Sequence, residues 1–83
     1  MEQQLRMILD DVGGLSVPAG SLSPRDDLFA AGLTSFKTVG VMLAIEDEFD
    51  VAVPDSLLVR ATFSSIASLA AAIASINGAA NAA

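Results

Sequence analysis

The sequence predicts an all-α domain: a small four-helix bundle with three longer helices, one short helix and a long first loop. Three observations support this. Apolar residues recur at helical spacing in three segments of the chain. Phe is the only aromatic residue, so the core must consist mainly of aliphatic side chains and Ala, which suit helices better than sheets. The length of 83 residues is enough for one small domain.

The first predicted helix covers residues 2–12. Leu5, Ile8, Leu9 and Val12 follow the spacing i, i+3, i+4 and i+7, which places them on one face. We expect Gly13-Gly14 to end this helix, because glycine accepts the left-handed conformation common at helix C-termini.

A long connection, residues 15–34, follows the first helix. Connections of this length are uncommon in small domains and are often functional or locally packed. Within it, Ser23-Pro24 followed by Asp26 predicts a capped helical turn, with Ser23 as the N-cap and Pro24 at the first helical position.

The second predicted helix runs from about Ser35 to about Asp50. Its apolar stripe consists of Thr38, Val41, Met42, Ile45 and Phe49. Pro54 disfavours the helical conformation in the residue before it, so residues 51–53 should be extended. Residues 55–60 are then expected to form the short helix.

The last predicted helix is capped by Ser64 or Ser65. Its buried face is expected to contain Ile66, Leu69, Ala70, Ile73 and Ile76. We expect Asn77-Gly78 to close it, so that a single domain spans residues 1–78 and residues 79–83 form a disordered tail.

The composition excludes several kinds of chemistry. The chain has no Cys and no His, which removes disulfides, thiolate or imidazole metal sites, Cys nucleophiles and His-based acid–base catalysis. It also lacks a Gly-rich phosphate loop and the spacing of an EF-hand loop. We therefore expect no catalytic residue, no metal site and no enzymatic activity; an enzyme using carboxylates alone is the remaining catalytic alternative.

The charge is strongly acidic, with a net charge of −6 and a pI near 4.1. Such a surface is repelled by nucleic acid and by anionic membranes, and it attracts a partner with a basic docking face. The alternative is that the acidity only maintains solubility. The N-terminus lacks the features of a signal peptide, and the uncharged residues 61–83 are mostly small. We expect a cytoplasmic monomer.

Residues 27–36 read Asp-Leu-Phe-Ala-Ala-Gly-Leu-Thr-Ser-Phe. This stretch resembles the attachment motif of the acyl carrier protein and peptidyl carrier family. Residues 45–51, followed by Val53-Pro54, resemble that family's acidic helix end and its proline-marked loop, and residues 63–66 resemble the entry into its last helix. The resemblance covers roughly residues 22–76. It implies an acyl-carrier-protein-like fold and a 4′-phosphopantetheine arm on Ser35, whose thiol carries cargo as a thioester.

The position of Ser35 is consistent with that implication on physical grounds. It lies at the start of the second predicted helix, where free N–H groups and the positive end of the helix dipole stabilise a phosphate. The sequence offers no general base nearby, so a separate transferase would have to modify the serine. The alternative is that Thr34 and Ser35 are merely N-caps.

The chain departs from the family pattern at several positions. Many acyl carriers have Asp before the serine and Leu after it, where this chain has Thr34 and Phe36, and Lys37 and Gly40 occupy positions where fatty-acid-type carriers show acids. The acidic residues near the C-terminus of the second predicted helix interact unfavourably with the helix dipole, at a cost of about 0.3–1 kcal/mol each. This cost favours a docking role for them over a stabilising one. The residues predicted to dock partners are Thr34, Phe36, Lys37, Gly40, Glu46 and Asp47.

The resulting hypothesis is a carrier that holds an aminoacyl or acyl group on Ser35 and delivers it between enzymes. Aminoacyl cargo is favoured, because the chain looks like stand-alone carriers, some of which are loaded by an ATP-using ligase related to class II tRNA synthetases. Its partners would be a phosphopantetheinyl transferase, an amino acid or acyl ligase and a downstream acceptor enzyme. One alternative is a fatty-acyl or polyketide-type carrier; another, of a different class, is an unmodified helical interaction adaptor.

Overall fold

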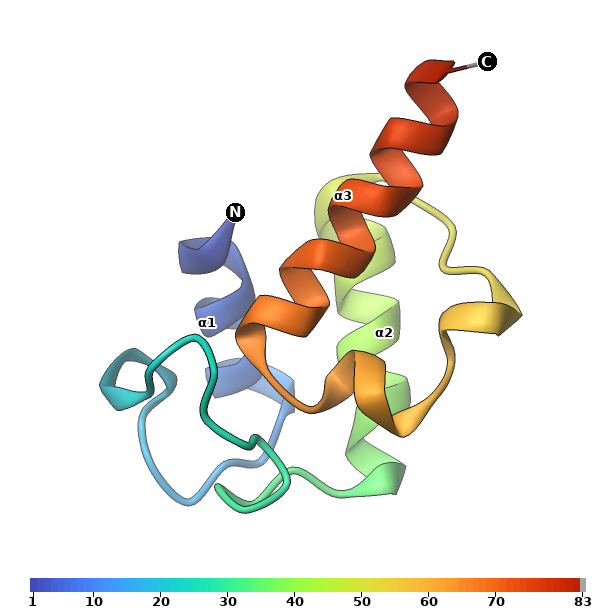
Figure 1. Cartoon of the computed structure of the whole chain (residues 1–83). Coiled ribbons are helices and arrows are strands. Elements are labelled where there is room, and N and C mark those ends of the chain that lie inside the picture. Colours follow the sequence, from blue (N-terminus) through green and yellow to red (C-terminus); the bar gives the residue numbers. More distant parts are fainter. Residues whose placement is uncertain (83) are drawn as a thin grey trace.

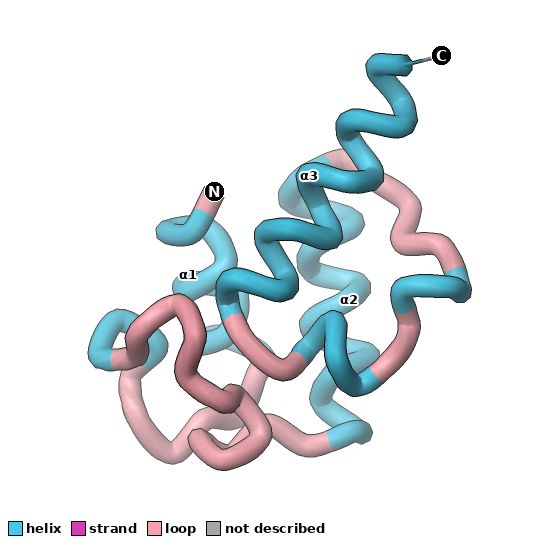
Figure 2. Tube along the Cα trace, viewed as in Figure 1, coloured by secondary structure: helices cyan, strands magenta, loops and turns pink. Residues whose placement is uncertain are grey.

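The computed structural model describes residues 1–82, and the side chains of residues 1–77. Its frame consists of three α-helices: α1 (Glu2–Val12), α2 (Ser35–Phe49) and α3 (Ile66–Ala82). Short 3₁₀ turns lie in the connections: η1 (Ala19–Ser21), η2 (Asp55–Leu57) and η3 (Arg60–Phe63). Over residues 1–82 the regular structure is entirely helical, which confirms the predicted all-α class (Figure 2).

The helix α1 packs against both α2 and α3, and the C-terminal half of α3 extends beyond the other two helices (Figure 1). The core lies where the three helices and the first connection meet. The predicted apolar faces of the helices supply most of it. The first connection adds Ala19, Leu28 and Leu33, and η3 adds Phe63. The buried apolar residues are Leu5, Ile8, Leu9, Ala19, Leu28, Leu33, Val41, Ile45, Phe63, Ile66, Leu69 and Ile73.

The predicted helix boundaries are confirmed at three places. Gly14 adopts the left-handed conformation after α1, with φ 65°. Asp50 ends α2 in the same region, with φ 53°. At the start of α3, Ser65 is the cap: its hydroxyl accepts from the N–H of Ser68 at 3.0 Å, and the Ser68 hydroxyl accepts from the Ser65 N–H at 3.0 Å. This reciprocal pair satisfies two N–H groups at the helix end.

The predicted short helix takes a different form. Instead of one helix over residues 55–60, the second connection contains two 3₁₀ turns, η2 and η3. They are separated by Leu58 and Val59, and the backbone of Val59 is extended, with φ −128° and ψ 156°. A β-branched side chain favours this conformation, so the helical path is interrupted.

The capped turn expected at Ser23 is present, since the Ser23 hydroxyl accepts from the Arg25 N–H at 3.3 Å. The segment at Ser23 is a single turn, closed by an Asp26 N–H that donates to the Ser23 carbonyl at 3.1 Å, and it does not continue as a helix. The reason is that Asp27 starts a new turn, its carboxylate accepting from the Phe29 N–H at 2.9 Å.

The prediction that α3 ends at Asn77-Gly78 was wrong, because the helix continues to Ala82. A glycine inside a helix costs about 1 kcal/mol relative to Ala, and the alanines that follow Gly78 are the strongest helix formers. The domain limit at residue 78 and the disordered tail over residues 79–83 stay predictions, and Ala83 lies outside the described residues.

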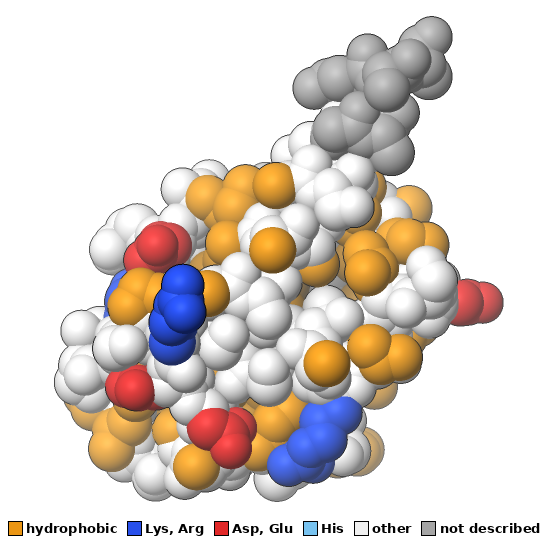
Figure 3. Space-filling view, viewed as in Figure 1, with side chains coloured by type: hydrophobic (Ala, Val, Ile, Leu, Met, Phe, Trp, Pro, Cys, Tyr) orange, Lys and Arg blue, Asp and Glu red, His pale blue; other side chains and the backbone are white. Residues whose placement is uncertain are grey.

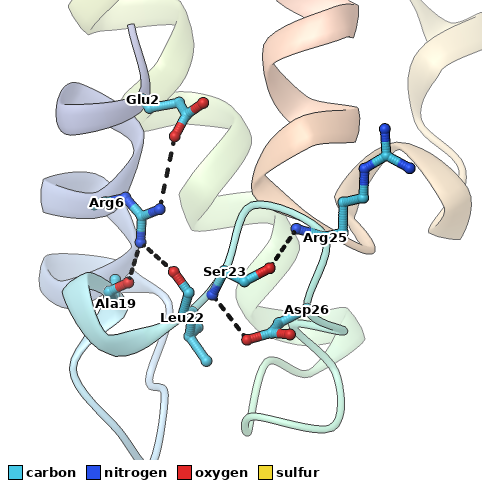
Figure 4. A network of polar contacts seen from close by, with 7 residues as sticks. All are labelled: Glu2, Arg6, Ala19, Leu22, Ser23, Arg25 and Asp26. Carbon is cyan, nitrogen blue, oxygen red and sulfur yellow. Dashed lines mark hydrogen bonds and ion pairs between the residues drawn. The ribbon is translucent and has the colours of Figure 1, made fainter.

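The first connection is fastened to α1 by side chains of that helix (Figure 4). The Arg6 guanidinium donates to the carbonyls of Ala19 and Leu22 at 2.6 and 2.7 Å, and it lies 3.6 Å from the Glu2 carboxylate. The Asp10 carboxylate accepts from the Ala19 N–H at 2.7 Å. The long loop is therefore locally packed, as its length led us to expect.

The same connection is also bonded to the start of α3. The Leu28 N–H donates to the Ser64 carbonyl at 2.8 Å, and the Ala67 N–H donates to the Pro24 carbonyl at 2.8 Å. Contacts on two sides thus hold the segment that leads into α2.

Candidate functional site

Gly32 sets the direction of the chain just before α2. Its φ is 118°, and a Cβ added there would lie 3.0 Å from the Ser16 backbone nitrogen. The chain folds back on residue 16 at this point, where the Ser16 N–H donates to the Ala31 carbonyl at 2.8 Å. Only glycine combines that φ with so close an approach. The residues before α2 therefore make a tight turn that requires glycine at position 32.

Thr34 is the N-cap of α2. Its hydroxyl oxygen accepts from the N–H of Lys37 at 3.2 Å, and its backbone is extended. Ser35 follows as the first helical residue. Its side chain is exposed, and its hydroxyl makes no hydrogen bond with any residue that the structure describes. Capping is thus the role of Thr34 and not of Ser35.

The surroundings of the Ser35 hydroxyl favour an attached anion. The N–H groups of the first helical residues have no partner within the helix, and the positive end of the dipole points outward there. The first turn of α2 contains no acidic residue that would oppose an anion. No carboxylate or amine of the described residues is hydrogen-bonded to this hydroxyl. An anion linked to this hydroxyl would therefore be stabilised by its surroundings.

A groove of about 340 Å³ opens beside Ser35, between α2 and the second connection. Its lining is mostly apolar. Ser35 and Thr38 are its hydroxyl residues, and Arg60 supplies a positive charge; the guanidinium carbon of Arg60 lies 3.9 Å from the centre of the Phe29 ring. The residues that line the groove are Phe29, Ser35, Thr38, Val39, Met42, Leu58, Val59, Arg60 and Phe63.

One face of α2 exposes apolar side chains to solvent. Phe36 is 84% exposed, Val39 55% and Leu43 56%, and their spacing of i, i+3 and i+7 places them on one side of the helix. Hydrophobic side chains also gather over the second connection in the space-filling view (Figure 3), where Leu58 and Val59 are exposed. Phe36 was predicted to be a docking residue, whereas Val39 and Leu43 were missed. Their position off the buried stripe of α2 was the signal.

The other predicted docking residues lie in different surroundings. Lys37 is exposed, with its aliphatic chain over Gly14: a Cβ built on Gly14 would lie 3.3 Å from Lys37 Cε. Gly40 faces α1, where an added Cβ would lie 3.9 Å from Val12 Cβ. Both residues are therefore on the α1 side of α2, and Lys37 does not line the groove beside Ser35.

The predicted acidic docking residues lie far along α2 from the serine. Glu46 is eleven residues from Ser35, which corresponds to about 16 Å along the helix axis. It is half-buried, and its carboxylate accepts from the Val53 N–H at 2.9 Å, so it anchors the second connection. Asp47 is exposed. The structure thus brings Thr34 and Phe36 beside Ser35, and it does not bring Glu46 or Asp47 there.

The part of the chain that the structure describes holds neither a metal-binding cluster nor a membrane-spanning helix. No group of three or more acidic residues is placed to hold a metal ion. None of the helices in this part of the chain has the length and apolar character needed to span a bilayer.

A small all-α domain that presents an unbonded serine hydroxyl at a helix N-terminus has the features of a covalent carrier domain. The family model described as "Phosphopantetheine attachment site" matches residues 3–73. The chain belongs to this family. Its carrier proteins hold cargo without transforming it, so the chain is a carrier and not an enzyme, and its cofactor is covalently bound phosphopantetheine.

Two proteins of similar sequence are named aminoacyl carrier proteins. The chain is 46% identical over 66 residues to an aminoacyl carrier protein of Agrobacterium fabrum, a match that covers 80% of each protein.

Solved structures of similar fold also contain carrier proteins. A carrier protein from Agrobacterium tumefaciens, complexed with an engineered Bradyrhizobium japonicum glycine:[carrier protein] ligase and AMP, matches with a TM-score of 0.86 and 40% identity, over 89% of this chain and 99% of that one. A chain in the structure of the Bradyrhizobium japonicum glycine:[carrier protein] ligase complexed with glycylated carrier protein matches with a TM-score of 0.63 and 32% identity. The match covers 84% of this chain and 97% of that one.

Proposed function

We propose that Ser35 is the attachment point of the phosphopantetheine arm and that the chain carries an aminoacyl group between partner enzymes. The observation that supports this most directly is the Ser35 hydroxyl, which is exposed and unbonded at the first helical position of α2 while Thr34 caps the helix. When attached, the arm supplies a thiol that holds the aminoacyl group as a thioester.

Modification of Ser35 needs a phosphopantetheinyl transferase and coenzyme A as the donor. The reaction forms a bond between Ser35 Oγ and the pantetheine-bearing phosphorus of coenzyme A, and it breaks the donor's pyrophosphate bond, so that adenosine 3′,5′-bisphosphate leaves. The hydroxyl proton passes to a base of the transferase, since no side chain among the described residues is hydrogen-bonded to the Ser35 hydroxyl. The N–H groups at the start of α2 then lie next to the new phosphodiester.

Aminoacyl cargo is supported by the similar aminoacyl carrier protein and by the carrier proteins solved with a glycine:[carrier protein] ligase. The size of the groove beside Ser35 also supports aminoacyl cargo. Its volume of about 340 Å³ is at the lower end of the range of small-molecule sites. It gives little room for a long acyl chain in addition to an arm. We therefore propose a small amino acid as cargo and a fatty-acyl or polyketide group as the alternative.

We propose that the ligase and the acceptor enzyme dock on α2. The exposed apolar residues Phe36, Val39 and Leu43 form a face next to Ser35 that an apolar partner surface can cover. Thr34 and Lys37 flank that face at the start of the helix, and Asp47 extends it toward the other end. For Glu46 a hydrogen bond within the chain accounts for the position, so we give it the smaller part in docking. Packing against Val12 leaves room for a Cβ at Gly40, so a docking role for that glycine stays part of the proposal.

The place of action that we propose is the cytoplasm, where coenzyme A and ATP-dependent ligases are found. The net charge of −6 and the carrier proteins of similar sequence support this proposal. We also propose that the chain acts as a monomer, since a docking face beside Ser35 must be free for enzymes.

Intact-mass measurement tests the attachment. The chain is produced together with a broad-range phosphopantetheinyl transferase, and we expect its mass to rise by one phosphopantetheine group. Ser35→Ala should abolish the gain, whereas Ser75→Ala, which removes an exposed serine from α3, should retain it. An unmodified wild-type chain would instead favour the helical adaptor.

The cargo is tested by offering the modified protein to a glycine ligase and to an acyl ligase in separate reactions. We expect a thioester to form with the amino acid. Thioester formation with acyl donors alone would overturn the aminoacyl proposal and leave the attachment proposal intact.

A further inference from the structure

The chain has only four basic residues, and they differ in what surrounds them. Arg6 is bonded to two carbonyls of the first connection and lies close to Glu2. Lys37 has its aliphatic chain over Gly14, on the α1 side of α2. Arg25 belongs to the turn that starts at Ser23. Arg60 is the basic residue that lines the groove together with Ser35.

The Arg60 guanidinium is positioned by an aromatic ring, but it makes no hydrogen bond with the residues that the structure describes. It lies over the Phe29 ring, with 3.9 Å between the guanidinium carbon and the ring centre. Among the residues that the structure describes, no carboxylate lies within 4.0 Å of it and no carbonyl accepts from it. Stacking on an aromatic ring uses the face of the guanidinium and leaves the N–H groups at its edge free.

A free guanidinium edge selects for an anion with paired oxygens. Arginine binds carboxylate and phosphate through two parallel N–H···O bonds, and it does so more specifically than lysine. Ser35 lines the same groove at the start of α2, where backbone N–H groups without a partner in the helix add further donors. A phosphate linked to Ser35 would therefore lie between two sets of donors that come from distant parts of the sequence.

We propose that Arg60 is the counterion of the phosphodiester on Ser35, and that Phe29 orients its guanidinium for this contact. Arg60 is thus a positioning residue: it fixes the base of the arm against the groove. The proposal rests on the proposed attachment at Ser35. Since a groove-side ion pair is partly exposed, salt should weaken it.

Phosphorus NMR of the modified protein tests this without any enzyme reaction. In the wild type we expect the phosphodiester resonance to be broadened and displaced from that of free pantetheine 4′-phosphodiester. Arg60→Gln should narrow it and move it toward the free position, and Arg60→Lys should restore part of the displacement. Added salt should move the wild-type resonance in the same direction as Arg60→Gln.

A matched control and a second nucleus make the result specific. Arg25→Gln removes an equal charge from another exposed arginine, so it should leave the phosphorus resonance unchanged. In the unsubstituted protein, the Arg60 Nε–H resonance should shift between the unmodified and the modified form. Phe29→Leu should reduce both effects.

Several outcomes would overturn the proposal. Identical phosphorus spectra for the wild type and Arg60→Gln would do so, as would equal effects of the Arg25 and Arg60 substitutions or an Arg60 Nε–H resonance that does not respond to modification. The two proposals fail in distinguishable ways. A wild-type chain that gains no mass refutes the attachment and the counterion together, whereas a normal gain with unaltered spectra refutes the counterion alone.

Discussion

The two connections of the molecule differ in how they are held. The first, residues 15–34, is bonded to α1 through Arg6 and Asp10 and to the start of α3 through backbone groups. The second, residues 51–65, is bonded to α2 through Glu46 and exposes Leu58 and Val59. The first therefore positions the start of α2, and the second forms a wall of the groove beside it.

The difference shows that loop length alone does not decide how firmly a loop is placed. The first connection supplies three buried residues, Ala19, Leu28 and Leu33, whereas the second supplies Phe63. A carrier needs a fixed attachment point, and under the proposal that this point is Ser35 the first connection holds it in place. Under the same proposal the second connection lies where the arm or a partner makes contact, and its exposed apolar residues are available for that contact.

The largest expected effect comes from releasing the first connection. Arg6→Met keeps the aliphatic chain but leaves the carbonyls of Ala19 and Leu22 without their charged donor. We expect the free energy of unfolding to fall by about 2–4 kcal/mol, because part-buried acceptors lose charge-assisted hydrogen bonds. Urea denaturation measures this.

Arg25→Met is the matched control, since it removes the same charge from an exposed arginine. Its effect should stay within about 0.5 kcal/mol, as for most surface substitutions. If the two variants lost equal stability, the first connection would not be fastened by Arg6.

A smaller effect is expected in the second connection. Glu46→Ala removes the acceptor of the Val53 N–H, and we expect a loss of about 1 kcal/mol in the free energy of unfolding. Asp47→Ala, at an exposed neighbouring position, should change stability by less. A loss from Glu46→Ala as large as that from Arg6→Met would remove the contrast between the two connections.

The smallest expected effect is an increase in stability, from a substitution at Gly40. Gly40→Ala adds a methyl group at an ordinary contact distance from Val12 and removes a glycine from a helix interior. We expect the free energy of unfolding to rise by up to about 1 kcal/mol. A loss would mean that α1 and α2 pack more closely than the 3.9 Å separation indicates. Reduced loading by the ligase with raised stability would support the predicted docking role of Gly40.

Local signals in the sequence predicted the parts of the fold that depend on neighbouring residues. The helix faces, the left-handed Gly14 and the Ser65 cap all follow from short-range rules. The interruption at Val59 and the extension of α3 past Gly78 were missed, because several weak preferences compete there.

The candidate site divides in the same way. Ser35 was identified because the motif around it, residues 27–36, is continuous in sequence. The groove was not predicted from the sequence, since Phe29, Val39 and Arg60 come together only through the tertiary fold. The bond between Arg6 and the first connection was missed for the same reason: its partners lie 13 and 16 residues away.

Localisation of the modification within one peptide tests the central claim most directly. Trypsin cuts after Arg25 and Lys37 and releases Asp26–Lys37, whose only hydroxyl side chains are Thr34 and Ser35. Fragmentation of this peptide from the modified protein should place the phosphopantetheine on Ser35, with Thr34 unmodified. A modification on Thr34, or on a different peptide, would contradict the account.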